Sequence, residues 1–308
     1  MIVIRNIRDL QVEGLMATIG FFDGVHLGHR FLIREMIEQA KKRKLPSAVI
    51  TFPEHPRKVL QADYQPKLLN SFEEKLEHLA ETGLDYCIIL DFTIELSNYT
   101  AQAFITSILA KQLHVKTLLI GYDHRFGHDR ADGFEQYVAY GADCGMEVLE
   151  APRFIEDQIA VSSSEVRKLL ANCQVEEARK LLTYPYQIRG SIVSGYKVGR
   201  TLGFPTANIQ VDEPYKVLPG IGVYAVRVDL QGKQYKGMLY IGSRPTLNNG
   251  ENITLEVNIF DFSGDIYNNE ISVSFIYYIR GDIRFNSLEE LKEQLENDRK
   301  TVYERLLL

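Results

Sequence analysis

The sequence predicts two domains, an α/β domain with a mostly parallel sheet and then an antiparallel β domain that ends in a helix. The chain has 308 residues, more than one hydrophobic core comfortably organises. Apolar runs of strand length alternate with helical periodicity up to about residue 182. After Pro185 the pattern changes to strict alternation of apolar and polar residues, which is typical of antiparallel strands. We therefore expect domains over residues 1–183 and 184–308.

Strand and helix signals follow one another through the first domain. An apolar run over 15–22 predicts a strand, and apolar residues recurring from Leu32 to Ala40 predict the helix after it. Ser71 and Glu74 form a capping box for a helix that Gly83 should end. Further strands are expected over 47–52, 86–90 and 117–121, and further helices over 100–113, 161–170 and 174–182. This order predicts a parallel sheet covered on both faces.

The turn between the first strand and its helix reads TIGFFDGVHLGHR, residues 18–30. Gly20, Gly24 and Gly28 let the backbone turn sharply and approach a ligand, while the helix start offers unpaired N–H groups to an anion. His26 and His29 add imidazole donors for phosphate oxygens. We interpret the loop as a nucleotide phosphate cradle. The alternatives are a glycine-rich turn with two exposed histidines and a partial metal pair, although no Cys or further His nearby completes a zinc site.

Three further polar segments occupy the ends of expected strands or the start of a helix. They are residues 53–57, residues 122–127, and the serine run of VSSSEVRKLL, which is followed by Arg167. Loops at the carboxyl ends of parallel strands commonly bind ligands, and hydroxyls at a helix start can hold a phosphate. Each segment also has a plain alternative, an ordinary polar turn or a helix cap.

The second domain shows strand patterns and a terminal helix. From Tyr224 to Leu230 one face is apolar, and a Gln231-Gly232 turn follows. More strands are expected over 253–260 and 271–278, and Ser287 with Glu290 should cap the last helix. This arrangement predicts a small barrel or sandwich.

Two pairs of polar side chains in this domain are candidates for chemistry. Thr206 and Asn208 lie two apart, hence on one side of an extended segment, and offer oxygen ligands of the kind that Mg²⁺ accepts beside phosphates. In the strand around Glu256, alternation brings Glu256 and Asn258 together on the face opposite the apolar residues. If that face borders a pocket, Glu256 is a candidate general base. A solvated carboxylate on an outer face is the alternative, which composition alone favours.

Composition limits the partners and the compartment. The formal net charge of −6 and pI near 5.7 argue against nucleic acid as the main partner. Cys87, Cys144 and Cys173 are scattered, which indicates buried apolar thiols and a reducing compartment. At the N-terminus, Arg5 stands before any apolar stretch of signal-peptide length can develop, and no later apolar run reaches membrane-spanning length. We expect a cytoplasmic protein without a membrane partner.

Taken together, ordered motifs across nearly the whole chain resemble the bacterial bifunctional riboflavin kinase/FAD synthetases. The first domain carries GFFDGVHLGHR, TFPEHPRKVL, GYDHRFG and VSSSEVRKLL. The second carries YPYQIRGSIVSGYKVGRTLGFPTANI, GIGVYAV, YIGSRPT, LEVNIFDFSGDIY and RFNSLEELKEQLENDRK. The resemblance implies a Rossmann-like nucleotidyltransferase domain, then a β-barrel riboflavin kinase domain with its terminal helix. The implied reactions convert riboflavin to FMN and FMN to FAD, with ATP and Mg²⁺.

For the adenylyl-transfer half, the resemblance implies that His26 and His29 bind ATP phosphates and stabilise the transition state. Other residues would bind the nucleotide: Gly20, Phe21, Asp23, Ser163, Ser164 and Arg167. The remaining implied group borders the flavin or adenosine: Asp123, Arg125 and Phe126.

For the kinase half, the resemblance implies that Glu256 is the base for the riboflavin 5′-hydroxyl. This reverses the preference from composition for a solvated carboxylate at that position. Thr206 and Asn208 would hold Mg²⁺ and ATP phosphates, and Arg280 would reach the flavin. Gly195 and Gly199 would join the nucleotide site. The expected partners are ATP, riboflavin and FMN, and a homo-oligomeric state stays open.

The chain departs from the family pattern at four positions: Glu54, His124, Tyr240 and Asn258. The last two concern the kinase pocket. One alternative function is a flavin-binding regulator that has lost catalysis, and another is a different H-x-G-H nucleotidyltransferase. The intact histidines, together with Thr206, Asn208 and Glu256, argue against lost catalysis, and the second alternative leaves residues 187–308 unexplained.

Overall fold

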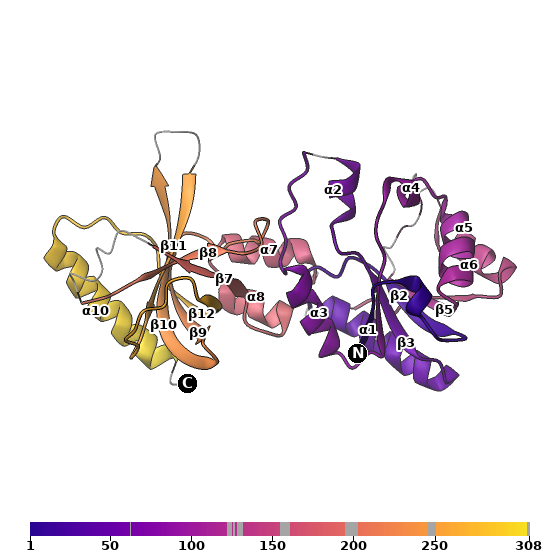
Figure 1. Cartoon of the computed structure of the whole chain (residues 1–308), viewed down its shortest axis with the longest axis horizontal. Helices are drawn as coiled ribbons and strands as arrows, with labels where there is room; N and C mark the ends of the chain where they lie inside the picture. The colour runs from indigo at the N-terminus through magenta and orange to yellow at the C-terminus, as the bar shows by residue number, and fades with distance from the viewer. Residues whose placement is uncertain are drawn as a thin grey trace. The chain divides into compact units, whose positions relative to one another are not determined.

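The computed structural model describes residues 1–61, 63–121, 125, 127, 132–154, 161–194, 203–245 and 251–306. The chain divides into two compact units, Met1–Ser163 and Ser164–Leu308 (Figure 1). The helices between residues 163 and 182 count with the second unit because they bond to it. Leu170 O accepts from Gly220 N at 2.9 Å, and Glu176 Oε2 accepts from Tyr278 N at 3.5 Å. The domain boundary at residues 183 and 184 stays a prediction.

The first unit is built on a six-stranded sheet in which every neighbouring pair is parallel. Its strands are β1 (Ile2–Ile4), β2 (Leu15–Ile19), β3 (Ser47–Thr51), β4 (Tyr86–Ile89), β5 (Val115–Ile120) and β6 (Glu147–Glu150). Their order across the sheet is β1-β4-β3-β2-β5-β6. The four central strands confirm the sequence pattern. The edge strands β1 and β6 were not predicted, because they are only three and four residues long.

Helices cover both faces of this sheet (Figure 1). The helical elements of the unit are η1 (Ile7–Asp9), α1 (Leu27–Arg43), α2 (Pro56–Leu60), α3 (Phe72–Ala80), α4 (Ile94–Ser97), α5 (Ala101–Ala103), η2 (Phe104–Gln112) and α6 (Phe134–Asp143). Ile33 of α1 and Leu79 of α3 are fully buried against one face, and Tyr137 of α6 is fully buried against the other. The predicted three-layer arrangement is thus confirmed.

Two helices in this unit test the local signals. The capping box at α3 is reciprocal: Ser71 Oγ accepts from Glu74 N at 3.2 Å, and Glu74 Oε2 accepts from Ser71 N at 2.8 Å. The helix expected over 100–113 starts at its Thr100 cap, but Phe104–Gln112 is a π-helix. In one short segment, the spacing of apolar residues does not distinguish the i→i+4 hydrogen bonds of an α-helix from the i→i+5 hydrogen bonds of a π-helix. The sequence therefore suggested an ordinary α-helix.

The second unit contains a closed antiparallel barrel with the strand order β10-β11-β8-β7-β12-β9. Its elements are α7 (Ser163–Ala171), α8 (Val175–Leu182), β7 (Gln187–Val193), β8 (Ala207–Val211), β9 (Gly222–Leu230), β10 (Lys233–Pro245), β11 (Glu251–Ile259), β12 (Glu270–Arg280) and α10 (Leu288–Arg305). The barrel and the terminal helix are confirmed, and of the two architectures that alternation left open, the barrel is the one formed.

Alternation along the strands sorts the barrel residues into an interior and an outer layer. Tyr224, Val226 and Val228 of β9 are fully buried, as predicted. On the outside, Val302 and Leu306 at the C-terminal end of α10 pack on apolar residues of β9, β10 and β12. Helix α10 therefore rests on one side of the barrel (Figure 1). Leu291 and Leu295 of its N-terminal half line the cavity described below.

Two candidate active sites

The turn between β2 and α1 brings the two histidines of the first domain together. His26 is the N-cap of α1, and its Nδ1 accepts from the backbone N–H of His29 at 3.4 Å. The two imidazole rings stack with their centroids 3.7 Å apart and their planes 16° from parallel. Two aligned rings at the start of a helix suit a ligand that carries negative charge.

The charge state of His29 follows from its surroundings. Burial lowers its pKa well below the usual value, and the neighbouring His26 and Lys75 lower it further. Its Nδ1 atom is buried and, within the described part of the chain, has no hydrogen-bond partner. His29 is therefore a neutral ring with unused hydrogen-bonding capacity, which a phosphate oxygen can satisfy.

The loop that carries these histidines is held in a strained conformation. Phe22 and Val25 both have positive φ, 55° and 34°, which is uncommon for residues with side chains. The buried Asp23 carboxylate accepts from the N–H groups of Leu69 and Asn70 at 2.9 and 3.3 Å. Asp23 thus fixes the loop to the segment before α3, which gives physical content to the expectation that it shapes the site.

A buried lysine beneath the loop was missed at the sequence level. Lys75 of α3 is 3% exposed, and its Nζ donates to Phe52 O at 2.7 Å and to Phe21 O at 3.2 Å. The same ammonium lies 4.2 Å from the centroid of the Phe21 ring. Burial lowers the pKa of Lys75 to about 8. One signal was available: Lys75 stands on the apolar helix face of Phe72, Leu76 and Leu79.

Beside the loop lies a cavity of about 400 Å³ whose walls include five aromatic side chains. Among the residues that line it are Gly20, Phe21, Phe52, Phe92, Tyr99, Phe104, Arg125 and Gly127. Arg125 Nη1 donates to Asp132 O at 2.9 Å. A planar aromatic ligand suits such walls. The predicted Asp123 and Phe126 lie outside the described residues.

The serine run at the start of α7 was expected to close on the same phosphates. Ser163 Oγ donates to Asp23 O at 2.9 Å, so this serine lies at the nucleotide loop. Ser164 and Arg167 belong to the second compact unit, and their expected contact with phosphates stays a prediction.

In the barrel, strand register brings the candidate kinase residues together. Glu256 of β11 stands opposite Asn208 of β8. Thr206, just before β8, donates through Oγ1 to Glu256 Oε2 at 3.4 Å. Asn258 is buried, and its Nδ2 donates to Pro205 O at 2.6 Å, which fixes the segment that carries Thr206. Glu256 and Asn258 thus share one face, as the alternation predicted.

That face borders a cavity, which is the condition under which Glu256 is a candidate general base. Phe204, Tyr240, Glu256 and Asn258 line a space of about 310 Å³ under the N-terminal half of α10. A second cavity of about 660 Å³ lies on the barrel at Pro205, Ala207 and residues 262–267. Thr206 lines both cavities, so it lies where ligands in the two spaces would meet. The predicted Gly195 and Gly199 lie outside the described residues.

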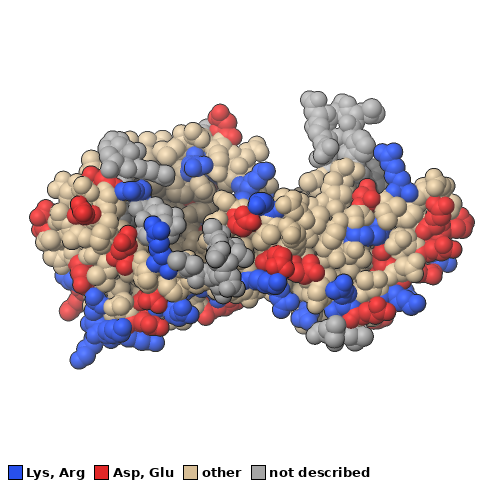
Figure 2. Space-filling view, turned by 180° about the vertical axis from the view of Figure 1, so that it is seen from behind, with Lys and Arg blue, Asp and Glu red and all other residues tan. Residues whose placement is uncertain are grey.

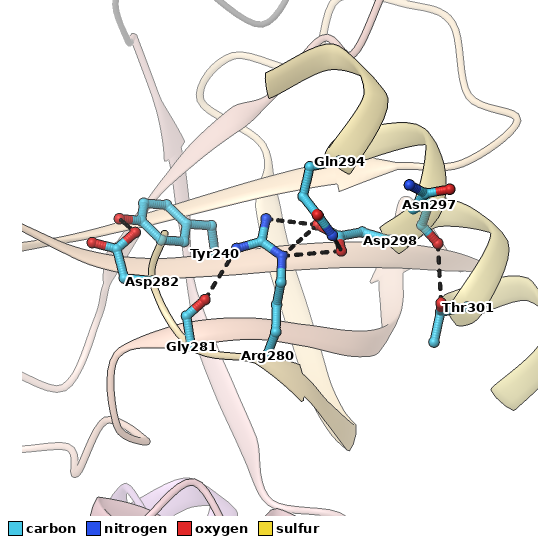
Figure 3. A network of polar contacts seen from close by, with 8 residues as sticks. All are labelled: Tyr240, Arg280, Gly281, Asp282, Gln294, Asn297, Asp298 and Thr301. Carbon is cyan, nitrogen blue, oxygen red and sulfur yellow. Dashed lines mark hydrogen bonds and ion pairs between the residues drawn. The ribbon is translucent and has the colours of Figure 1, made fainter. Parts of the chain in front are cut away.

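Arg280 lines the smaller cavity, and its guanidinium is bound by the protein itself (Figure 3). Its Nε lies 3.0 Å from both carboxylate oxygens of Asp298, and its Nη2 donates to Asp298 Oδ2 at 2.7 Å. Nearby, Tyr240 donates through its hydroxyl to Asp282 Oδ1 at 2.9 Å. Burial and this hydrogen bond to Asp282 raise the pKa of Tyr240 to about 12. At this edge of the cavity, Arg280 and Tyr240 are therefore each hydrogen-bonded to a carboxylate of the protein.

The donors around Glu256 fit a hard cation. A hydroxyl, an amide and a carboxylate at Thr206, Asn208 and Glu256 offer oxygen ligands, which Mg²⁺ prefers. The described residues contain no cluster of three or more His, Cys, Asp or Glu side chains that could hold a metal without help. This pattern suits Mg²⁺ that is shared between a few side chains and substrate phosphates.

Two further observations concern the surface charge and the apolar character of the helices. On the face shown in Figure 2, Lys and Arg side chains are interspersed with Asp and Glu. Among the helices that the structure describes, none combines the length and the apolar character that a bilayer crossing requires.

Comparisons with known proteins agree with both sites. A family model described as FAD synthetase matches residues 9–165, and one described as riboflavin kinase matches residues 182–306. The bifunctional riboflavin kinase/FMN adenylyltransferase of Escherichia coli K12 is 40% identical over 302 residues, 98% of this chain and 96% of that protein. The Haemophilus influenzae protein of the same description is 38% identical and covers 97% of both chains.

A solved structure shows the same fold across the chain. A crystal structure from Streptococcus pneumoniae, described as a macrolide-efflux protein, superposes with a TM-score of 0.87 at 33% identity and covers 98% of both chains. Its description refers to transport, whereas both family models and the two curated relatives above refer to flavin chemistry.

Proposed function

The chain belongs to the bifunctional riboflavin kinase/FMN adenylyltransferase family, and on this premise we propose how its residues divide the two reactions. The enzyme phosphorylates riboflavin to FMN with ATP, and it transfers the adenylyl group of ATP to FMN to give FAD and pyrophosphate. One observation carries the proposal: each compact unit has its own cavity, which in the first unit lies beside the loop of the two histidines and in the second unit is lined by Thr206 and Glu256.

In adenylyl transfer, FMN attacks the α-phosphorus of ATP and pyrophosphate leaves. The flavin ring occupies the cavity of about 400 Å³, with Gly20, Phe21 and Arg125 at its edge. His26 and His29 hold phosphate oxygens, and the neutral His29 donates a hydrogen bond that strengthens as negative charge develops. Asp23 keeps the loop in the required conformation, and Ser163, Ser164 and Arg167 contact the phosphates.

In the kinase reaction, Glu256 takes the proton from the 5′-hydroxyl of riboflavin as its oxygen attacks the γ-phosphorus of ATP and ADP leaves. The flavin ring occupies the cavity of about 310 Å³, and the ATP phosphates occupy the larger neighbouring cavity. Thr206 borders both, which supports the view that transfer occurs beside it. Arg280 lies at the flavin side of this arrangement.

Thr206 and Asn208 would hold Mg²⁺ together with the ATP phosphates in the kinase half. The ion supplies positive charge for the transferred phosphoryl group. The chain's own residues set where that charge lies: Asn258 fixes the Pro205 carbonyl and therefore the neighbouring Thr206.

The cellular setting follows from composition and thiol environment. Cys87 is buried, and burial raises the pKa of its thiol to about 11, so it is unreactive. Cys144 and Cys173 are only partly buried, so the expectation of buried thiols is wrong for these two. We propose a reducing, cytoplasmic location, with no nucleic acid or membrane as a partner.

A time course of riboflavin, FMN and FAD with ATP and Mg²⁺ tests the proposal directly. We expect FMN to rise first and FAD to follow from it. Tight flavin binding without turnover at any pH or metal concentration would instead support a regulator. Preference for a flavin-free phosphate ester in a competition assay would support another H-x-G-H nucleotidyltransferase.

A further inference from the structure

A largely buried ion pair joins the last barrel strand to the terminal helix. The Arg280 side chain of β12 is 16% exposed and the Asp298 side chain of α10 is 2% exposed. Three contacts of 2.7 to 3.0 Å connect the guanidinium to the carboxylate. Gln294 Nε2 adds a donor to Asp298 Oδ1 at 2.8 Å, and Arg280 Nη1 donates to Gly281 O at 3.0 Å (Figure 3). Every nitrogen of the guanidinium is therefore engaged.

The members of this network differ in their relation to the kinase cavity. Arg280 lines the cavity, whereas Asp298 and Gln294 do not. Asp298 can therefore act on a ligand in the cavity only through Arg280 or through the helix that carries it. A bidentate pair fixes both the position and the plane of a guanidinium more strictly than one hydrogen bond does.

The same pair fixes the part of α10 that forms the cavity wall. Leu291 and Leu295 line the cavity, and Leu295 lies one helical turn before Asp298. Further along the helix, Val302 and Leu306 pack in the apolar cluster on the barrel, and Tyr303 donates to Asp261 Oδ2 at 2.8 Å. The C-terminal half thus has its own anchors.

In the N-terminal half of α10, Leu295 is partly buried against the same apolar cluster, and the ion pair adds a polar anchor one turn later. Leu288 at its start is 59% exposed, so it contributes little packing there. Buried ion pairs give little net stability relative to apolar replacements, but they select one geometry. Here the geometry selected is that of the wall formed by Leu291 and Leu295.

We propose that Asp298 is a positioning residue for the riboflavin kinase reaction, which fixes Arg280 and the helix wall around the flavin ring without touching substrate. This inference rests on the proposed assignment of the cavity to riboflavin. Asp298 lies 42 positions after Glu256 in the sequence and on a different element, helix α10.

The test measures steady-state FMN formation by full-length Asp298→Asn, with riboflavin and ATP varied separately. We expect the KM for riboflavin to rise about tenfold or more, with a smaller change in kcat, because misplacing the wall weakens flavin binding. The KM for ATP and the conversion of supplied FMN to FAD should stay at wild-type values. Glu296→Gln, which removes an exposed carboxylate from the same helix, is the matched control and should change nothing.

Thermal unfolding followed by circular dichroism checks that the barrel still melts cooperatively. If Asp298→Asn does not fold, Gln294→Leu replaces it, since that variant keeps the ion pair and loses only the amide donor. It should raise the riboflavin KM by roughly threefold. A folded Asp298→Asn with the wild-type KM for riboflavin overturns the proposal, as does an unchanged KM in Gln294→Leu if that variant is needed.

Leu295→Trp separates this inference from the function on which it rests. The larger ring fills the cavity, so it should block riboflavin if the flavin binds there. If Leu295→Trp blocks riboflavin and a folded Asp298→Asn does not weaken it, the positioning role alone is wrong. If Leu295→Trp leaves the riboflavin KM unchanged, the assignment of the cavity is wrong.

Discussion

Each half contains a cation beside its cavity, the buried Lys75 in one and the partly buried Arg280 in the other, and the protein holds the two by different means. Lys75 donates to the carbonyls of Phe21 and Phe52 and packs on the Phe21 ring, and no carboxylate lies within ion-pair distance among the described residues. Arg280 is held by the carboxylate of Asp298. A buried lysine can lose its proton, whereas an arginine cannot. Lys75 can therefore make the adenylyl-transfer site sensitive to pH, whereas Arg280 adds no such sensitivity to the kinase cavity.

The two cations also position different parts of the protein. Lys75 joins the carboxyl ends of β2 and β3, from which the nucleotide loops leave, so it orders backbone. Arg280 joins a strand to a helix whose side chains line a cavity, so it orders side chains. If the halves are independent, a change in one should leave the reaction of the other intact.

The largest effect is expected for Glu256→Gln in the kinase half. The variant keeps the size of the side chain and removes the proton acceptor, so FMN formation should fall by about 100-fold or more. Conversion of supplied FMN to FAD should persist, as measured by separating the flavins during a time course. A folded variant that loses both activities would break the division between the halves, and one that loses neither would make Glu256 an ordinary strand residue.

His29→Ala should give the mirror-image result. Removing a donor whose contribution grows in the transition state costs on the order of 100-fold, so FAD formation should fall while FMN still accumulates from riboflavin. The measurement is the same flavin time course, with exposed His114→Ala as the control for loss of a histidine. FAD formation at the wild-type rate would contradict the role of the loop.

Lys75→Met sharpens the contrast between the two cations. The variant removes the clamp on Phe21 and Phe52, so the kcat of adenylyl transfer should fall by roughly tenfold, with FMN formation unchanged. Lys41→Met, at an exposed position of α1, is the matched control. Equal rates for Lys75→Met and wild type would mean that the clamp serves stability alone.

We also expect the free energy of unfolding to depend on pH through Lys75, which a comparison of Lys75→Met with wild type can measure. Folding lowers the pKa of Lys75 from 10.5 to about 8, because burial outweighs the attraction of Asp23 and Cys87. Between these values the unfolded chain binds more protons, so this group makes the native state more stable as pH rises from about 8 toward 10.5. The difference in unfolding free energy between Lys75→Met and wild type should change over this window, as measured by urea titrations at several pH values. Parallel curves would show that Lys75 titrates normally.

Local patterns predicted the residues proposed to contact ligands better than the residues that support them. The turn with His26 and His29 is a contiguous string, and alternation alone brought Glu256 and Asn258 to one face. Lys75 was missed because a helical lysine is usually exposed. Asp298 was missed because its partner lies on another element, and only the packing of α10 on β12 brings them together.

The smallest effect is expected for Asn258→His, at the position where the chain departs from its family. Asn258 is 6% exposed and donates to Pro205 O, so its amide holds the segment that carries Thr206. A histidine can also donate to a carbonyl from this face, so the kinase rate should change only modestly, by about threefold or less. Asn258→Ala removes the donor altogether and should lower FMN formation by about tenfold, since an unpaired buried carbonyl costs 1–3 kcal/mol. The two variants are compared by initial rates of FMN formation at varied ATP, because a displaced Thr206 should weaken the use of ATP more than that of riboflavin. If Asn258→His is as defective as Asn258→Ala, the site requires the shape of the amide and the hydrogen bond to Pro205 is not what matters.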